Sequence, residues 1–153
     1  MTRIDNWQSN LSAVINARRE QSFMWGETDC TQFAFEAIKA VTGDDMAAPY
    51  YGKYTTAKGA LKILQKVDGV KTPTALFEKY LGEAKVIAFA RKGDVVTCDP
   101  KSIGYDAPDD AGAFGDVIGV CYGQMSYFVG ASGLVAVQTL QCAKCFHTGS
   151  IVQ

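Results

Sequence analysis

The sequence predicts an α+β fold in which N-terminal helices pack on a C-terminal antiparallel β-sheet. Apolar residues recur at helical spacing up to Gly82, and short β-type segments separated by turn residues follow from Ala84 onward. Helices that precede strands in this way are typical of α+β architectures. The chain has 153 residues, of which 48% are hydrophobic and 20% charged, so we expect one domain, residues 1–153, with a sizeable core.

Four helices are expected, and the second carries the clearest signals. It begins at Cys30 and stops at Gly43, with Asp29 as N-cap and Gln32 in the polar position of a capping box. One stripe of this helix should face the core, because apolar residues recur at helical spacing: Cys30, Ala34, Ala37, Ile38 and Val41. The other helices are expected from near Asn6, over about 56–67 and over 72–80.

The second half predicts six short strands, at residues 85–90, 94–98, 116–122, 125–129, 134–138 and 143–147. Two loops stand out. Residues 44–54 contain three tyrosines, which either line a groove or pin the loop to the core. Residues 99–115 form a connection long enough to be expected to be functional or mobile.

Composition excludes several classes of function. The net charge is -1, with 15 basic and 16 acidic residues and no basic run, so we expect no nucleic-acid partner. No stretch approaches the roughly 18 apolar residues of a membrane span, and residues 1–20 lack a secretory pattern. Five cysteines are an odd set without an export signal, so reduced thiols are expected, and no cofactor is implied.

Cys30 is the candidate nucleophile. A thiol in the first turn of a helix meets the positive end of the dipole and unpaired N–H groups, which favour the thiolate. The alternative is a small buried hydrophobe, a common role for free cysteine. A nucleophile also needs a base, and the only histidine of the chain, His147, lies near its far end.

Three motifs occur in an informative order: Trp25-Gly26-x-x-Asp29-Cys30, Lys92-Gly93-Asp94-Val95-Val96, and Val117-Ile118-Gly119-Val120-Cys121-Tyr122-Gly123. With the closing turn Gly133-Leu134-Val135, they make the chain resemble the NlpC-type, papain-like cysteine peptidases. It looks most like the small bacteriophage tail proteins of that superfamily. The resemblance covers about residues 23–146 and implies a papain-like fold.

The resemblance also implies site residues. The family nucleophile matches Cys30, but the position of the catalytic histidine, two residues before Gly119, holds Val117. Asp116 is one step away, and a one-residue step in a strand reverses the side chain, so it is expected to be a poor substitute. His147 is the other candidate base, if the final strand runs beside the start of the Cys30 helix.

A metal site is a further alternative. Cys142-Ala143-Lys144-Cys145 supplies half of a thiolate site, which Cys98 and Cys121 would have to complete. There is no second C-x-x-C, so we expect no metal. A thioredoxin-like role is disfavoured because the pair does not open a helix after a strand.

The expected function is therefore a structural or interaction component of a bacteriophage tail tip, in the baseplate hub region, with a degenerate cysteine peptidase fold. The resemblance implies other tail-tip proteins as partners, and a location in the virion after assembly in the host cytoplasm. The alternative is an active endopeptidase or amidase that uses Cys30 to open peptidoglycan during genome delivery.

Overall fold

The computed structural model describes residues 1–101 and 114–150 and has the α+β architecture predicted from the sequence. Four α-helices come first: α1 (Trp7–Arg18), α2 (Cys30–Thr42), α3 (Ala57–Asp68) and α4 (Pro73–Leu81). Six strands follow: β1 (Lys85–Val86), β2 (Val95–Cys98), β3 (Val117–Cys121), β4 (Met125–Val129), β5 (Leu134–Gln138) and β6 (Lys144–Phe146). Two short 3₁₀ helices, η1 (Ile87–Phe89) and η2 (Thr139–Gln141), complete the described elements.

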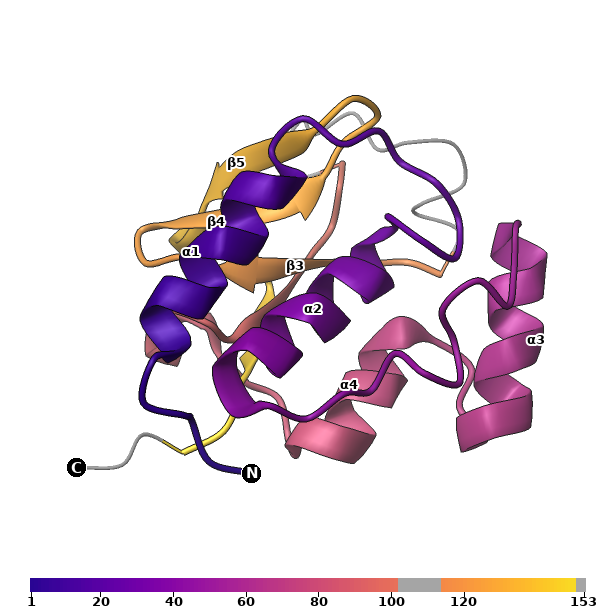
Figure 1. The fold of residues 1–153 in the computed structure, drawn as a ribbon, viewed down its shortest axis with the longest axis horizontal. Helices are drawn as coiled ribbons and strands as arrows, with labels where there is room; N and C mark the ends of the chain where they lie inside the picture. Colours follow the sequence, from indigo (N-terminus) through magenta and orange to yellow (C-terminus); the bar gives the residue numbers. More distant parts are fainter. Residues whose placement is uncertain (102–113, 151–153) are drawn as a thin grey trace.

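The strands form one antiparallel sheet in the order β1-β6-β2-β3-β4-β5. The last strand, β6, is inserted between β1 and β2 rather than added at an edge. Helices α1 and α2 lie across one face of the sheet, and α3 and α4 lie beyond α2, away from α1 (Figure 1). Cys30, the candidate nucleophile, is the first residue of α2 and packs against a cluster that includes Ile118 of β3.

Local signals in the sequence explain the helix ends. The side chains of Asp29, Thr56 and Thr72 each accept a hydrogen bond from the backbone N–H three residues later, which satisfies an otherwise unpaired donor. Gly43 and Gly69 end α2 and α3 in the left-handed conformation that glycine adopts without steric cost.

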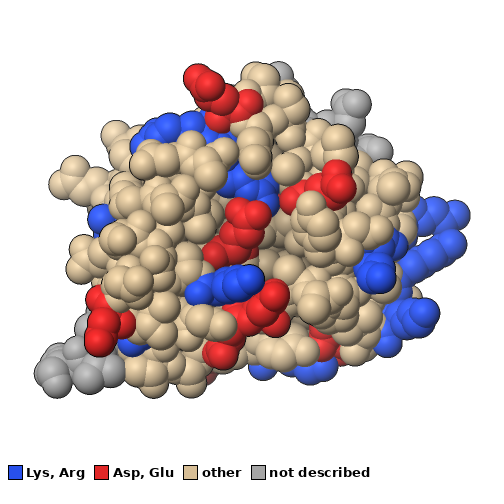
Figure 2. All heavy atoms as spheres, viewed as in Figure 1, with Lys and Arg blue, Asp and Glu red and all other residues tan. Residues whose placement is uncertain are grey.

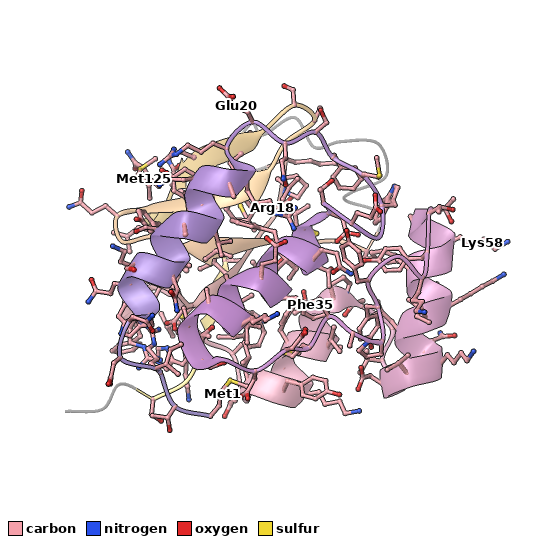
Figure 3. The ribbon with its side chains drawn as sticks, in the orientation of Figure 1. Met1, Arg18, Glu20, Phe35, Lys58 and Met125 are labelled. Atoms are coloured by element: carbon pink, nitrogen blue, oxygen red, sulfur yellow. The ribbon has the colours of Figure 1, made fainter. Side chains whose placement is uncertain are left out.

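Helices α1 and α2 are joined by packing and by one partly buried ion pair. Leu11 and Ile15 of α1 are fully buried in a cluster that includes Phe33 of α2. Arg18, at the end of α1, donates to Glu36 of α2 at 2.8 Å, and its side chain is seen between the two helices in Figure 3. The first helix is thus the amphipathic cover that its periodicity predicts.

Some predicted elements differ in the structure. The strand expected over 85–90 has only two strand residues, because the chain turns into η1 at Ile87 and leaves Val86 and Phe89 66% and 67% exposed. In the tyrosine loop, Tyr50 and Tyr54 are buried and Tyr51 is exposed, so the loop is pinned by aromatic side chains. Most of the long connection, residues 102–113, lies outside the described residues.

The surface agrees with the small net charge. Acidic and basic side chains are interspersed over the face shown in Figure 2, and blue side chains gather at the edge that α3 forms. Helix α3 supplies Lys58, Lys62 and Lys66. None of the described helices is long and apolar enough to cross a membrane.

Candidate functional site

The start of α2 is organised by the buried carboxylate of Asp29, which is 1% exposed. Its Oδ1 accepts from the N–H of Gln32 at 2.9 Å, and its Oδ2 accepts from the N–H of Gly26 at 2.8 Å and the hydroxyl of Tyr54 at 2.6 Å. Burial raises the pKa of Asp29, and these three hydrogen bonds oppose that rise. Asp29 therefore joins the helix start, the preceding turn and the tyrosine loop.

Gly26 explains another part of the Trp-Gly-x-x-Asp-Cys motif. Its φ is +84°, and a Cβ added there would lie 2.2 Å from the carbonyl oxygen of Tyr54. Its own carbonyl accepts from the N–H of Gly52 at 2.9 Å, so two backbone segments lie in direct contact here. Trp25 packs edge-to-face on Phe23 at 5.0 Å between ring centroids. Most of the motif thus has a structural role in holding the 50–54 loop against α2.

Cys30 lies half-buried at the bottom of a small, mostly apolar pocket. Aromatic and aliphatic side chains dominate the lining: Trp25, Tyr50, Tyr54, Ala60, Ile63, Leu64, Pro73 and Phe114, together with Thr31 and Asp116. The free volume is about 20 Å³, room for about one water molecule. Among the described residues, the sulfur therefore has no open cleft in which a peptide could lie.

The Cys30 thiol is not activated by its position at the helix start. Its pKa is raised from 9.0 to about 11, chiefly because burial disfavours the thiolate and also because the Asp29 carboxylate lies beside it. A backbone hydrogen bond from Ile118 and hydrogen bonds from Thr31 oppose the rise without cancelling it. The shift is opposite in sign to the one that the helix dipole alone predicts.

The structure corrects the assignment of faces on β3. Ile118 belongs to the buried cluster that contains Ala34 and Ile38 of α2, whereas Val117 belongs to the cluster on the opposite face of the sheet. Alternation along the strand then places Asp116 on the Cys30 side, where it lines the same pocket. Asp116 therefore does not point away from Cys30, contrary to the expectation from the one-residue step, and Val117 lies on the other face of the sheet.

His147 does not lie beside Cys30. Its Nδ1 is 2.7 Å from Oδ2 of Asp94, and its neighbour Thr148 donates its N–H to Asp94 Oδ1 at 2.9 Å. A Cβ added at Gly149 would lie 3.0 Å from the side chain of Thr42, the last residue of α2. Since α2 has 13 residues, its two ends are about 18 Å apart. His147 is therefore at the end of α2 opposite to Cys30.

The four remaining cysteines are buried in one apolar cluster on the outer face of the sheet: Cys98, Cys121, Cys142 and Cys145. Their thiols approach carbonyl oxygens, for example Cys145 to Val86 at 3.6 Å and Cys121 to Gly123 at 3.4 Å. Within the described part of the chain, no three of them bring their sulfurs within ligand distance of one another. They behave as small hydrophobic residues with weak donors.

One mixed group does come together, formed by Asp94, Cys145 and His147, with ligand atoms within 4.8 Å of one another. Its carboxylate is already occupied, because Oδ1 accepts from Arg3 at 3.1 Å and Thr148, and Oδ2 accepts from the N–H of Arg91 at 2.8 Å and from His147. Two guanidinium groups this close would repel a cation. The arrangement does not suit a metal ion.

Comparison with known proteins gives one assignment. Residues 2–148 match the family described as Domain of unknown function (DUF6950). The chain belongs to the DUF6950 family. No curated protein matches it.

The sequence patterns did not indicate two hydrogen-bonding residues of this DUF6950 chain, Tyr54 and Asp94. Tyr54 contributes the third hydrogen bond to Asp29 from 25 residues away. At the other end of α2, the Asp94 carboxylate accepts hydrogen bonds from Arg3 and Arg91 and contacts the ring of His147. The only available signal for Asp94 was its place in the Lys92-Gly93-Asp94 turn, which indicates a tight turn but not its long-range partners.

Proposed function

We propose that this DUF6950 chain is a structural and interaction component of a bacteriophage tail tip, built on a papain-like, NlpC-type fold that has lost its peptidase chemistry. The proposal is carried by the state of Cys30. Its pKa of about 11 leaves the thiol protonated near neutral pH, and the chain's single histidine is held by Asp94 at the far end of α2. No imidazole lies beside the thiol, and the carboxylate that lines the same pocket, Asp116, belongs to a class of groups that are weaker bases than imidazole. Thiolate formation and protonation of a leaving amine therefore lack the assistance that a histidine provides.

The arrangement of the elements supports the choice of scaffold. A helix that begins at a cysteine packs on an antiparallel sheet, and the strand facing it is the glycine-containing β3, in the order that the resemblance implies. Fold does not determine activity, and a scaffold can serve as a docking module after its chemistry is lost. The pocket at Cys30, with room for about one water molecule, supports the same conclusion.

The decisive experiment is digestion of purified peptidoglycan by the native protein and by the Cys30→Ala variant, with an active NlpC-type enzyme as positive control. We expect both forms to release no muropeptides above the background. Cleavage by the native protein that is lost in Cys30→Ala would overturn the loss of chemistry, since only a working nucleophile depends on this sulfur.

The tail assignment has its own test. Virions of a phage that encodes this chain would be cross-linked and analysed by mass spectrometry. We expect cross-links from exposed lysines such as Lys58 and Lys62 of α3 to other tail-tip proteins. Complete and infectious tails that lack the chain would contradict the assignment.

A further inference from the structure

A second hollow lies at the end of α2 that is distant from Cys30. It is open, has a volume of about 730 Å³, and is lined by Met1, Tyr80, Leu81, Arg91, His147, Gly149 and Ser150. None of these lining residues has an acidic side chain, and the side chains of Arg91 and His147 are cationic or can become so. Among the described residues that line it, the hollow therefore presents positive charge and no carboxylate.

The imidazole of His147 is held in one orientation by the fully buried carboxylate of Asp94. Because its Nδ1 is engaged with Asp94 at 2.7 Å, the ring presents Nε2 as the nitrogen left for a ligand, and its side chain is 30% exposed. When the ring is protonated, Nε2 is a charged donor fixed in direction.

Arg91 is the second group that faces the hollow, with 31% of its side chain exposed. Its Nη2 donates to the carbonyl of Gly149 at 2.9 Å and to Asp94 at 3.4 Å, and its Nε is 3.5 Å from Asp94. Its Nη1 makes no hydrogen bond to any described residue and remains available. The guanidinium is thus anchored on one side and open on the other.

Among the described residues, the charges around Asp94 do not cancel. Arg3 and Arg91 contribute two positive charges against one negative charge, and protonation of His147 adds another positive charge. Among the described residues, the other titratable groups at the hollow are the α-amino group of Met1, the phenol of Tyr80 on α4, which donates to the carboxylate of Asp68, and the thiol of Cys145 on β6, whose pKa is raised to about 11 by burial. An anion in the hollow would offset this excess.

We infer that this hollow is a binding site for a phosphate group, held by the free Nη1 of Arg91 and the Nε2–H of protonated His147. Asp94 positions both donors without reaching the ligand. The site is independent of the proposed tail function, because it lies at the other end of α2 from Cys30 and requires no catalysis. The ligand is either free phosphate or a phosphate ester on a small molecule, since both present the same oxygens.

The test uses the full chain labelled with ¹⁵N, titrated with sulfate at constant ionic strength while the His147 ring and Arg91 Nε signals are followed by NMR. Sulfate keeps its charge between about pH 5.5 and about pH 8, so a change in its affinity over this range reports on groups of the protein itself. We expect saturable shifts at the lower pH. At the higher pH we expect the affinity for sulfate to be lower by roughly tenfold or more.

The matched variants are His147→Asn and Lys144→Gln. The asparagine amide can still donate to Asp94 in place of Nδ1, but it offers nothing in place of Nε2, whereas Lys144 is an exposed lysine on β6 outside the hollow. We expect His147→Asn to lose roughly tenfold or more in affinity and Lys144→Gln to bind as the native chain does. Inorganic phosphate and glycerol phosphate, compared in the same assay, separate the free ion from the ester.

Three results would overturn the inference. They are the absence of saturable shifts at the lower pH, an affinity that is the same at both pH values, and an equal loss of affinity in Lys144→Gln and His147→Asn. The pH comparison on the native chain keeps the test decisive if a variant folds poorly.

Discussion

The hydroxyl of Tyr54 donates a 2.6 Å hydrogen bond to Oδ2 of Asp29, the residue that caps the Cys30 helix. Both groups are buried, and Asp29 raises the pKa of the Tyr54 phenol together with burial. The residues that surround the candidate nucleophile thus serve first to fasten a loop to a helix. This relationship leads to the first prediction.

Replacing Tyr54 by phenylalanine should lower the free energy of unfolding by about 1.5 to 3 kcal/mol, because the buried Asp29 carboxylate loses one of its three donors. Urea unfolding followed by circular dichroism measures the change. Tyr51→Phe is the control, since Tyr51 is 54% exposed and should change stability by less than about 0.5 kcal/mol. Equal effects of the two substitutions would show that the hydrogen bond contributes nothing.

Replacing Gly26 by alanine should be more damaging than the same change at Gly52. Both glycines have positive φ, +84° and +71°, so both substitutions carry backbone strain of about 1 kcal/mol or more. Only Gly26 also has a backbone oxygen 2.2 Å from the new Cβ, whereas nothing lies within 4 Å at Gly52. The melting temperatures of the two variants should therefore differ clearly, with Gly26→Ala lower; identical values would contradict the close approach to Tyr54.

The Cys30 thiol should react slowly with iodoacetamide. A pKa of about 11 in place of 9.0 reduces the thiolate fraction about 100-fold at pH 8, because the fraction falls tenfold per pH unit. Mass spectrometry of the native protein over a pH series should show a rate that still rises above about pH 9, with Cys30→Ser to identify the labelled site. A rate that reaches its plateau below about pH 8 would indicate an activated thiol and would support the enzyme alternative.

Asp68 should contribute stability that depends on pH. Burial favours its protonated form, but hydrogen bonds from Tyr50, Tyr80 and Lys79 outweigh burial and hold the pKa of this carboxyl below 3.8. Its contribution is therefore present above the unfolded-state pKa, about 3.9, and is lost as the pH falls through the lower folded-state value.

The matching experiment compares Asp68→Asn with the native protein in urea at several pH values. We expect a loss of about 1.5 to 3 kcal/mol at pH 7 that shrinks below about pH 4, because the native carboxyl then becomes neutral too. Asp44→Asn, at an exposed position after α2, is the control and should change little at any pH. A difference that stays constant down to acid pH would contradict the lowered pKa.

The buried pair of Arg3 and Asp94 should respond asymmetrically to substitution. Both side chains are fully buried, and Asp94 is the only acidic partner that Arg3 contacts among the described residues. Asp94→Asn should cost about 3 to 5 kcal/mol because it leaves Arg3 charged and unpaired. Arg3→Met should cost less, since Arg91 and His147 still accompany the carboxylate. Thermal unfolding of both variants checks the order, and a larger loss in Arg3→Met would reverse it.

The helices and most strands were predictable because they are local. Apolar spacing and capping residues predicted α2 to within a residue, and the strand Met125–Val129 has the bounds expected from its alternation. Residues 85–90 were predicted as a strand because they are largely apolar, yet Val86 and Phe89 point to solvent and the chain turns instead. Apolar composition alone does not identify the buried face.

The candidate site was predictable only in part, and β3 shows why. Both faces of this strand are buried, so its sequence Val-Ile-Gly-Val-Cys contains no polar alternation that would tell which face meets the helix. Val117 was assigned to the position of the base from its spacing to Gly119 in the resemblance, and no alternation of polar residues along the strand could check that assignment. The pairing of His147 with Asp94 joins residues 53 positions apart, which no local pattern encodes.

The position of β6 has a consequence for how the protein is made. Since this strand fits between β1 and β2, the sheet stays incomplete until residues 144–146 have left the ribosome, and the β1 segment has no partner strand before then. A nascent chain halted before Lys144 would expose the open side of β2, a template for aggregation. Emergence of residues 144–146, rather than early synthesis of the helices, is therefore the event that commits this sheet to its final form.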